Sequence, residues 1–132
     1  MLNIPEKLQD LLSNESKAHL FLATINSDGS PQVTPVWFNT DEDHILINTA
    51  VGRIKDKNMR NRENVALCIA DPADPYRYIQ IQGKVVSHTT EGADEHIDAL
   101  CLKYTGQEKY PWRKPNEQRV TYKILPIKID AR

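Results

Sequence analysis

The chain has 132 residues, of which 39% are hydrophobic and 27% charged, and these proportions fit one globular domain. Seventeen Lys and Arg are balanced by eighteen Asp and Glu, so the formal charge of −1 argues against a protein that coats nucleic acid or a membrane through bulk charge. No apolar run approaches the roughly 18 residues of a membrane helix and no basic-then-apolar signal opens the chain, so we expect a cytoplasmic protein.

Hydrophobic periodicity and turn residues divide the chain into strands and short helices. Pro5 suits the first turn of an opening helix, in which the leucines at positions 8, 11 and 12 fall on one face. The pattern then predicts, in chain order, strands at 19–25, 32–38 and 44–49, a helix at 53–62, strands at 64–70 and 76–87, a helix at 91–104 and a strand at 119–129. Residues 71–75 and 107–116 are rich in proline and polar side chains and are expected to be loops.

Five residues carry positional meaning within this pattern. Asp28-Gly29 lies between two apolar runs and is a strong hairpin signal, because glycine adopts positive φ without steric cost. Pro35 cannot donate to a strand ladder, so it marks a sheet edge, a bulge or a place where something other than a strand lies alongside. Gly83 is a candidate bulge within a long strand, and Gly106 stands where the second long helix should end.

The order of elements favours a mainly β fold. Tight hairpins at the start require antiparallel pairing, and six strands with short connections and small helices suit a closed or partly closed barrel better than a parallel α/β sheet. No repeat, low-complexity segment or linker divides the sequence, so residues 1–132 are expected to form a single domain.

The most informative segment is residues 53–62, which hold five cations and one anion in a chain whose net charge is −1. The segment follows a strand and opens a helix, where free backbone N–H groups and the helix dipole favour a compact anion such as phosphate. Arg53 and Lys55 are placed to grip one phosphate from two sides, Arg as a bidentate fork and Lys as a point charge. The charge run taken alone favours a solvated basic helix with no ligand.

A second segment fits a planar ligand with a phosphorylated tail. Such a ligand needs an apolar surface to lie against, hydrogen-bonding groups for its ring edge and cations for its phosphate. The surface is expected from Thr34, Pro35, Val36 and Trp37, and the small polar groups from Asn48 and Thr49 at the end of the next strand. Trp37 taken alone is also consistent with an ordinary core residue.

Other chemistries find little support in the sequence. The four histidines lack metal-ligand spacing, no metal site is predicted, and no nucleophile–base arrangement or glycine-rich phosphate loop is evident. Cys68 and Cys101 are far apart and flanked by apolar residues, so they are expected to be buried reduced thiols rather than a disulfide. A small nucleic-acid-binding barrel remains a weaker alternative and would show a steep salt dependence of binding.

Several of these segments together resemble the split β-barrel flavin-binding superfamily, the pyridoxamine 5'-phosphate oxidase-like proteins. The hairpin at 18–38 with its Thr34-Pro35-Val36-Trp37 segment, the stretch at 47–59 and the strands at 65–72 and 78–85 carry the resemblance. They are most similar to the branch of F420-dependent oxidoreductases, which use a deazaflavin in place of FMN.

The resemblance implies a six-stranded antiparallel split barrel of Greek-key type, paired as a homodimer with two cofactors at the subunit interface. It implies that Arg53 and Lys55 hold the cofactor phosphate with Lys57 and Asn58 close by. Residues 34–37 would run along the ring, and Asn48 and Thr49 would lie near its linker. The cofactor, coenzyme F420 or FMN, carries the hydride, while the protein supplies position and electrostatics.

The function expected is therefore a flavin- or deazaflavin-dependent oxidoreductase that acts on a small organic substrate. One alternative is a carrier that binds a flavin, haem or similar anionic aromatic without turnover, since the sequence shows no evident acid, base or nucleophile. Another is an FMN-dependent enzyme that oxidises vitamin B6 compounds. The chain lacks the long C-terminal extension with which true pyridoxamine phosphate oxidases grip their substrate, which speaks against this second alternative.

Overall fold

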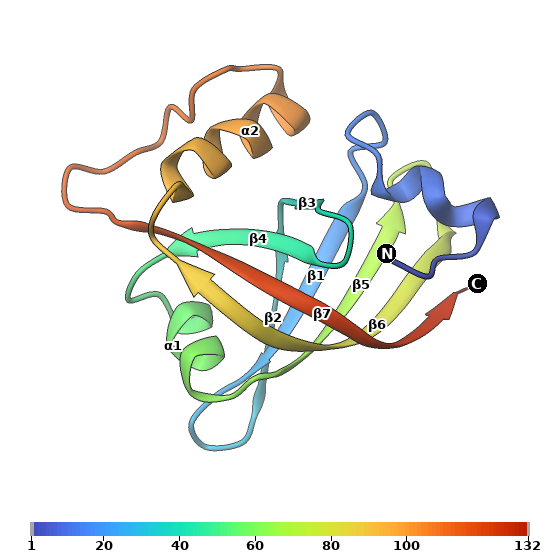
Figure 1. Ribbon diagram of the computed structural model, residues 1–132, viewed down its shortest axis with the longest axis horizontal. Coiled ribbons are helices and arrows are strands. Elements are labelled where there is room, and N and C mark those ends of the chain that lie inside the picture. Colours follow the sequence, from blue (N-terminus) through green and yellow to red (C-terminus); the bar gives the residue numbers. More distant parts are fainter. Residues whose placement is uncertain (1, 132) are drawn as a thin grey trace.

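The computed structural model describes residues 2–131, which fold as one curled antiparallel sheet with short helices around it (Figure 1). The elements of this part of the chain, in order, are the 3₁₀ helix η1 (Glu6–Leu12), β1 (His19–Ile25), β2 (Pro31–Val36), β3 (Phe38–Thr40), β4 (Ile45–Ala50), α1 (Ile54–Asn61), β5 (Asn64–Asp71), β6 (Asp74–Thr89), α2 (Ala93–Thr105) and β7 (Arg119–Ala131). The fold is mainly β, as predicted.

The strand order across the sheet is β2-β1-β5-β6-β7-β4-β3, and every neighbouring pair is antiparallel. Helix η1 packs on β5 and β6, α1 on β1 and β4, and α2 on β7 and β4. Figure 1 shows the sheet curled into a half-barrel, with η1 near one end and α1 and α2 toward the other. The architecture is the split barrel that the sequence indicated.

The core follows from strand alternation, because side chains on every second residue face the same side of the sheet. The inward set is branched and aromatic and almost fully buried, and η1 adds two leucines to it. These residues include Leu8, Leu11, Leu20, Leu22, Phe38, Ile45, Ile47, Leu67, Ile69, Ile79, Ile81, Val120, Tyr122 and Ile124. The opposite face of β1 and β2 keeps Phe21 at 40% and Val33 at 66% exposure.

The predicted strand at 32–38 is divided in two at Trp37, so residues 2–131 contain seven strands rather than the expected six. The reason lies in the sheet order. β2 pairs with β1 at one edge and β3 pairs with β4 at the other, and Trp37 is the single residue between them. The chain therefore steps across the opening of the barrel at Trp37, and Pro35, with no N–H to donate, lies on an edge strand as expected.

The prediction of a loop at 71–75 is wrong. β5 and β6 pair as far as Asp71 and Asp74, which leaves a tight turn of two residues in place of a loop. Gly83 lies at a shift in the β6–β7 register, which confirms the predicted bulge. Gly106 ends α2 with φ of +81°, a conformation that favours glycine.

The two cysteines differ in environment. Cys101 on α2 is buried, as expected, while Cys68 on β5 is only half-buried, because it faces away from the core with Phe21. Burial raises the pKa of the Cys68 thiol. Among residues 2–131, no helix has the length and apolar character that crossing a membrane requires.

Candidate functional site

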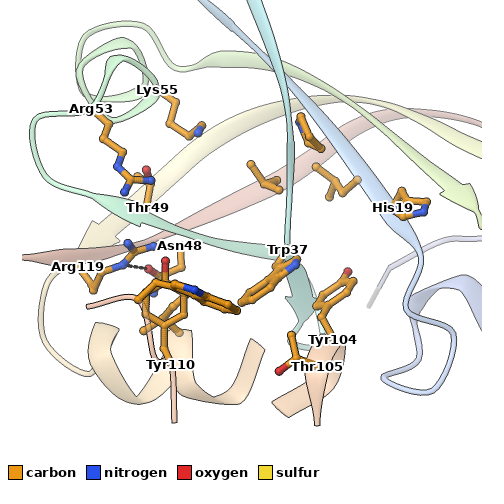
Figure 2. A pocket seen from close by; sticks show the side chains of 15 residues that line it. His19, Trp37, Asn48, Thr49, Arg53, Lys55, Tyr104, Thr105, Tyr110 and Arg119 are labelled. Carbon is orange, nitrogen blue, oxygen red and sulfur yellow. Dashed lines mark hydrogen bonds between the residues drawn. The ribbon is translucent and has the colours of Figure 1, made fainter. Parts of the chain in front are cut away.

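A cavity of about 500 Å³ opens where the chain crosses between the barrel edges. Its walls come from the start of β1, β2, Trp37, the end of β4, the start of α1, α2, the following loop and the first residue of β7. Seven of the ten residues expected at the site line it: Pro35, Val36, Trp37, Asn48, Thr49, Arg53 and Lys55. Figure 2 shows Arg53 and Lys55 on one side of the cavity and the rings of Trp37, Tyr104 and Tyr110 on another, with Arg119 beside Tyr110.

The basic side of the cavity combines Arg53, Lys55 and Arg119. One carboxylate, that of Glu117, serves both arginines, at 2.6 Å from Arg119 Nη1 and 3.5 Å from Arg53 Nη2. Lys55 has no carboxylate partner within residues 2–131. Burial, followed by the charges of Arg53 and Arg119, lowers the pKa of Lys55. Three cations against one anion leave an excess of positive charge that a phosphate would neutralise.

The start of α1 is held rigidly behind these cations. The buried carboxylate of Asp56 accepts hydrogen bonds from the Gly52 N–H (2.9 Å), Arg60 Nε (3.0 Å) and the Tyr122 hydroxyl (2.6 Å). Burial raises the pKa of Asp56, but the bonds from Tyr122 and Gly52 and the charge of Arg60 lower it below its usual range. An ionised Asp56 near the helix N-terminus fixes the turn that presents Arg53.

Thr49 supplies a hydroxyl without a partner. Its side chain is 1% exposed, lines the cavity and makes no hydrogen bond within the described chain. Figure 2 places it beside Arg53 in that view. A buried hydroxyl left unbonded costs free energy, and a ligand oxygen in the cavity would satisfy it. The Thr34 hydroxyl is likewise buried and unpartnered in residues 2–131, but Thr34 lies outside the cavity wall.

Asn48 lines the cavity, yet its amide bonds mainly to the protein. Its Nδ2 donates to the Ala93 carbonyl (2.9 Å) and lies 3.2 Å from His96 Nδ1, and its Oδ1 accepts from Arg119 Nε at 2.8 Å. The predicted contact between Asn48 and a ligand therefore has little free hydrogen-bonding capacity to draw on, and Asn48 instead joins β4 to α2 and β7.

The aromatic side of the cavity is built by residues far apart in sequence. The rings of Trp37 and Tyr104 are stacked with centroids 5.5 Å apart, and Tyr110 meets Trp37 edge-on at 6.2 Å. Trp112 meets Tyr110 edge-on at 5.5 Å and is 56% exposed at the mouth. Burial raises the pKa of Tyr104 to about 12, so its hydroxyl stays protonated.

Lys57 and Asn58 do not line the cavity. Lys57 is exposed, because two residues along a helix rotate a side chain to roughly the opposite face from Lys55. Asn58 is buried, and its amide donates to Thr24 Oγ1 at 3.0 Å and Asn26 Oδ1 at 2.8 Å, which ties α1 to β1 and its hairpin. These contacts give Asn58 a structural role in the folded chain.

Arg119 and the aromatic residues of α2 and the following loop belong to this site, although the sequence did not predict them there. Arg119 appears in the sequence as the first residue of a predicted strand, and only the pairing of Asn48 with Thr121 and Ala50 with Arg119 brings it to the cavity. The cluster of aromatic residues at 104–112 is a sequence signal for a ligand-binding wall. Its position in the fold depends on the loop after α2, which the hydrophobic pattern did not place.

Comparison with known proteins identifies relatives of the whole chain. The family model described as pyridoxamine 5'-phosphate oxidase matches residues 4–130. A solved structure named F420 reductase is 27% identical with a TM-score of 0.82, covering 96% of this chain and 98% of its own. No protein of curated function matches the sequence.

Two further solved structures share the fold at lower identity. The conserved hypothetical protein Rv2991 from Mycobacterium tuberculosis is 21% identical with a TM-score of 0.68, covering 98% of this chain and 84% of its own. HupZ from Group A Streptococcus is 19% identical with a TM-score of 0.65, covering 96% of this chain and 91% of its own.

Proposed function

Because the chain belongs to the pyridoxamine 5'-phosphate oxidase family, we propose that it binds coenzyme F420 or FMN and transfers a hydride to or from a small organic substrate. The similarity to a structure named F420 reductase, at 27% identity over nearly the full length of both chains, supports the deazaflavin as the first choice. Either cofactor would supply the hydride chemistry, and the protein would bind and orient the reactants.

The residues present fit such a cofactor. Arg53 and Lys55 would hold its phosphate, and the unpartnered Thr49 hydroxyl would donate to a phosphate oxygen. The segment from Pro35 to Trp37 would lie along the ring, because it is an edge strand with an aromatic residue at its end. The observation that carries the proposal is this junction of a cation excess, a buried free hydroxyl and an aromatic wall in one cavity.

A homodimer is the second part of the proposal. The outer face of β1, β2 and β5 has a hollow of about 380 Å³ whose lining includes Phe21, Val33 and Cys68. Phe21 and Val33 are 40% and 66% exposed, and burying such side chains on association is favourable. Pro35 belongs to the same strand as Val33 and also lines the main cavity, so a second copy seated on this face would lie next to the cofactor site.

The test is an absorbance and fluorescence titration of the purified protein with FMN and with coenzyme F420. We expect binding of at least one of them, and the double variant Arg53→Ala/Lys55→Ala should lose about 3 kcal/mol or more of binding free energy, since two charge-assisted contacts disappear. Lys57→Ala is the matched control, because Lys57 is an exposed cation on the same helix that does not line the cavity. Equal affinity of the double variant and the native protein would exclude this placement of the cofactor.

Turnover separates an oxidoreductase from a carrier. The protein loaded with reduced cofactor is mixed with small organic acceptors, and reoxidation is followed by absorbance. Catalysed reoxidation is the result expected for an enzyme. Tight binding without any acceptor that reoxidises the cofactor faster than it does free in solution would favour the carrier.

A further inference from the structure

Arg119 is the most deeply buried of the three cations that line the cavity, at 5% exposure. Its Nε donates to Asn48 Oδ1 (2.8 Å), its Nη1 donates to Glu117 Oε1 (2.6 Å), and its guanidinium lies 5.3 Å from the centre of the Tyr110 ring. Its remaining nitrogen, Nη2, donates to no group within residues 2–131. Nη2 is also not completely buried, so a ligand can reach it. Two N–H donors of a fixed guanidinium are therefore free for a ligand in the cavity.

The direction of this guanidinium depends on the orientation of the Asn48 amide. Both hydrogens of Asn48 Nδ2 are directed to α2, one to the Ala93 carbonyl (2.9 Å) and one to His96 Nδ1 (3.2 Å). The amide oxygen must then point the other way, where it accepts the Arg119 Nε–H. A reversed amide would set two donors against each other at Arg119.

His96 fixes that amide, because its own ring is held in one orientation. Its Nε2 lies 2.9 Å from Asn39 Oδ1, an acceptor, so Nε2 carries the proton and Nδ1 is left to accept from Asn48. The Thr121 hydroxyl also lies 3.2 Å from Nδ1. Burial, reinforced by the nearby charge of Arg119, lowers the pKa of His96 to about 4, so the ring is neutral near pH 7.

We propose that Arg119 binds the anionic group of the ligand held in this cavity and that His96 is a positioning residue that directs Arg119 through Asn48. The proposal deepens the proposed function, because it adds a third cation to the phosphate site of the same cavity. The ligand chemistry is that of a phosphate or carboxylate, whose oxygens can accept charge-assisted hydrogen bonds from the two N–H groups of Nη2. His96 itself need not touch the ligand, and it does not line the cavity.

The first experiment measures the affinity of Arg119 variants for FMN by fluorescence quenching and for inorganic phosphate by NMR titration. Arg119→Gln should weaken binding of both probes by about tenfold to a hundredfold, because a charge-assisted contact is lost. Arg119→Lys, which keeps the charge but not the planar guanidinium held by Asn48 and Glu117, should fall in between. Arg77→Gln is the matched control, since Arg77 is an ion-paired arginine that contacts Asp10 and Asp71 and does not line the cavity.

The second experiment is a double-mutant cycle between His96 and Arg119. His96→Leu removes the acceptor for Asn48 and should weaken phosphate binding about tenfold, while His96→Asn, which offers an amide oxygen near the position of Nδ1, should recover part of the affinity. If His96 acts through Arg119, His96→Leu causes no further loss in the Arg119→Gln background. His88→Leu is the control, because His88 also contacts an arginine, Arg60, outside the cavity.

The outcomes separate this inference from the proposed function. Arg119→Gln protein that binds phosphate and FMN like the native protein, while Arg53→Ala/Lys55→Ala protein does not, overturns the inference and leaves the proposed function standing. His96→Leu could instead weaken phosphate binding by the same factor in the native and the Arg119→Gln backgrounds. That result would give His96 a structural role only and would overturn the proposal that it positions Arg119. Phosphate binding that needs Arg119 and His96 in a protein that binds neither cofactor supports the inference and overturns the proposed function. Native protein that binds none of the probes overturns both.

Discussion

Trp37 and Tyr104 stack with nearly parallel rings, their centroids 5.5 Å apart and their planes 6° from parallel. Trp37 is the residue at which the chain crosses between the two edges of the sheet, and Tyr104 lies near the end of α2. The Tyr104 hydroxyl also donates to the Ala18 carbonyl at 2.8 Å, just before β1. One contact therefore both anchors α2 across the opening of the barrel and forms a wall of the cavity.

Removing this stack should affect folding and binding together. Tyr104→Phe keeps the ring and loses one hydrogen bond, so it should lower the free energy of unfolding by about 1 kcal/mol with little change in FMN affinity. Tyr104→Leu also loses the aromatic pair, which is worth about 0.5–1.5 kcal/mol beyond its buried area, and should weaken FMN binding as well. Urea unfolding and FMN titration measure the two effects. Equal behaviour of the two variants in both assays would show that the stack contributes nothing.

The neighbouring residue, Lys103, is a buried cation without a carboxylate partner in residues 2–131. Its Nζ donates to the Phe38 carbonyl at 2.8 Å and lies 4.1 Å from the centre of the Phe38 ring. Burial lowers the pKa of Lys103 from 10.5 to about 8. Between about pH 8 and 10.5 the folded protein has released this proton while the unfolded chain still holds it, so the free energy of unfolding should rise with pH across that window.

Lys103 should raise the free energy of unfolding by about 3 kcal/mol across this window. Below pH 8 it should cause no change with pH, because the amine is protonated in both the folded and the unfolded state there. Other lysines and tyrosines titrate in the same range, so the measurement is the difference between native protein and Lys103→Met, which keeps most of the side-chain volume. Urea unfolding at pH 7.5, 9 and 10 should show the free energy of unfolding of the native protein rising with pH relative to that of Lys103→Met. Parallel curves would mean that Lys103 is charged in the folded protein throughout.

The sequence predicted most of the strands because their signals are local. Alternation marked β1 and β5 almost to the residue, and the Asp28-Gly29 turn fixed the first hairpin. The break at Trp37 escaped because it depends on which strands form the sheet edges. That order is set by long-range pairing, and a run of strand-forming residues from 32 to 38 does not disclose it.

The residues of the site also differ in whether the sequence could predict them. Arg53, Lys55 and Thr49 lie close in sequence, so their grouping could be predicted from the transition between strand and helix. Arg119 and Tyr110 join them only through the pairing of β7 with β4 and the path of the loop after α2. These contacts are tertiary, and no local pattern encodes them.

β6 and β7 pack closely at Gly83. A Cβ at this position would lie 2.6 Å from Ile124 Cγ2, a buried atom, in place of an ordinary van der Waals contact. Gly83→Ala should therefore lower the free energy of unfolding by about 1–3 kcal/mol through overpacking. Thermal unfolding of Gly83→Ala beside Ser87→Ala, a change at an exposed position of the same strand, provides the comparison. An unchanged or higher midpoint for Gly83→Ala would show that Ile124 can move aside without cost.

Glu117 competes with the ligand for the arginines of the cavity. Its carboxylate is 8% exposed and contacts both Arg53 and Arg119, so any phosphate held there meets a like charge nearby. Glu117→Gln keeps the size and removes the charge, and it should tighten binding of inorganic phosphate about fivefold to tenfold, or roughly 1 kcal/mol. Because the Glu117 carboxylate is largely buried, salt screens it only weakly, so the NMR titration should show a similar gain at low and high salt.

The same substitution should lower the free energy of unfolding by a few kcal/mol, since it leaves the buried Arg119 guanidinium with a weaker partner. Glu63→Gln, which removes a carboxylate paired with Lys84 outside the cavity, should change neither phosphate affinity nor its salt dependence. A loss of phosphate affinity in Glu117→Gln would reverse the interpretation, because the carboxylate would then be needed to hold Arg119 in place more than it repels the ligand. Opposite changes in stability and affinity are thus the specific result that identifies Glu117 as a competitor for the two arginines.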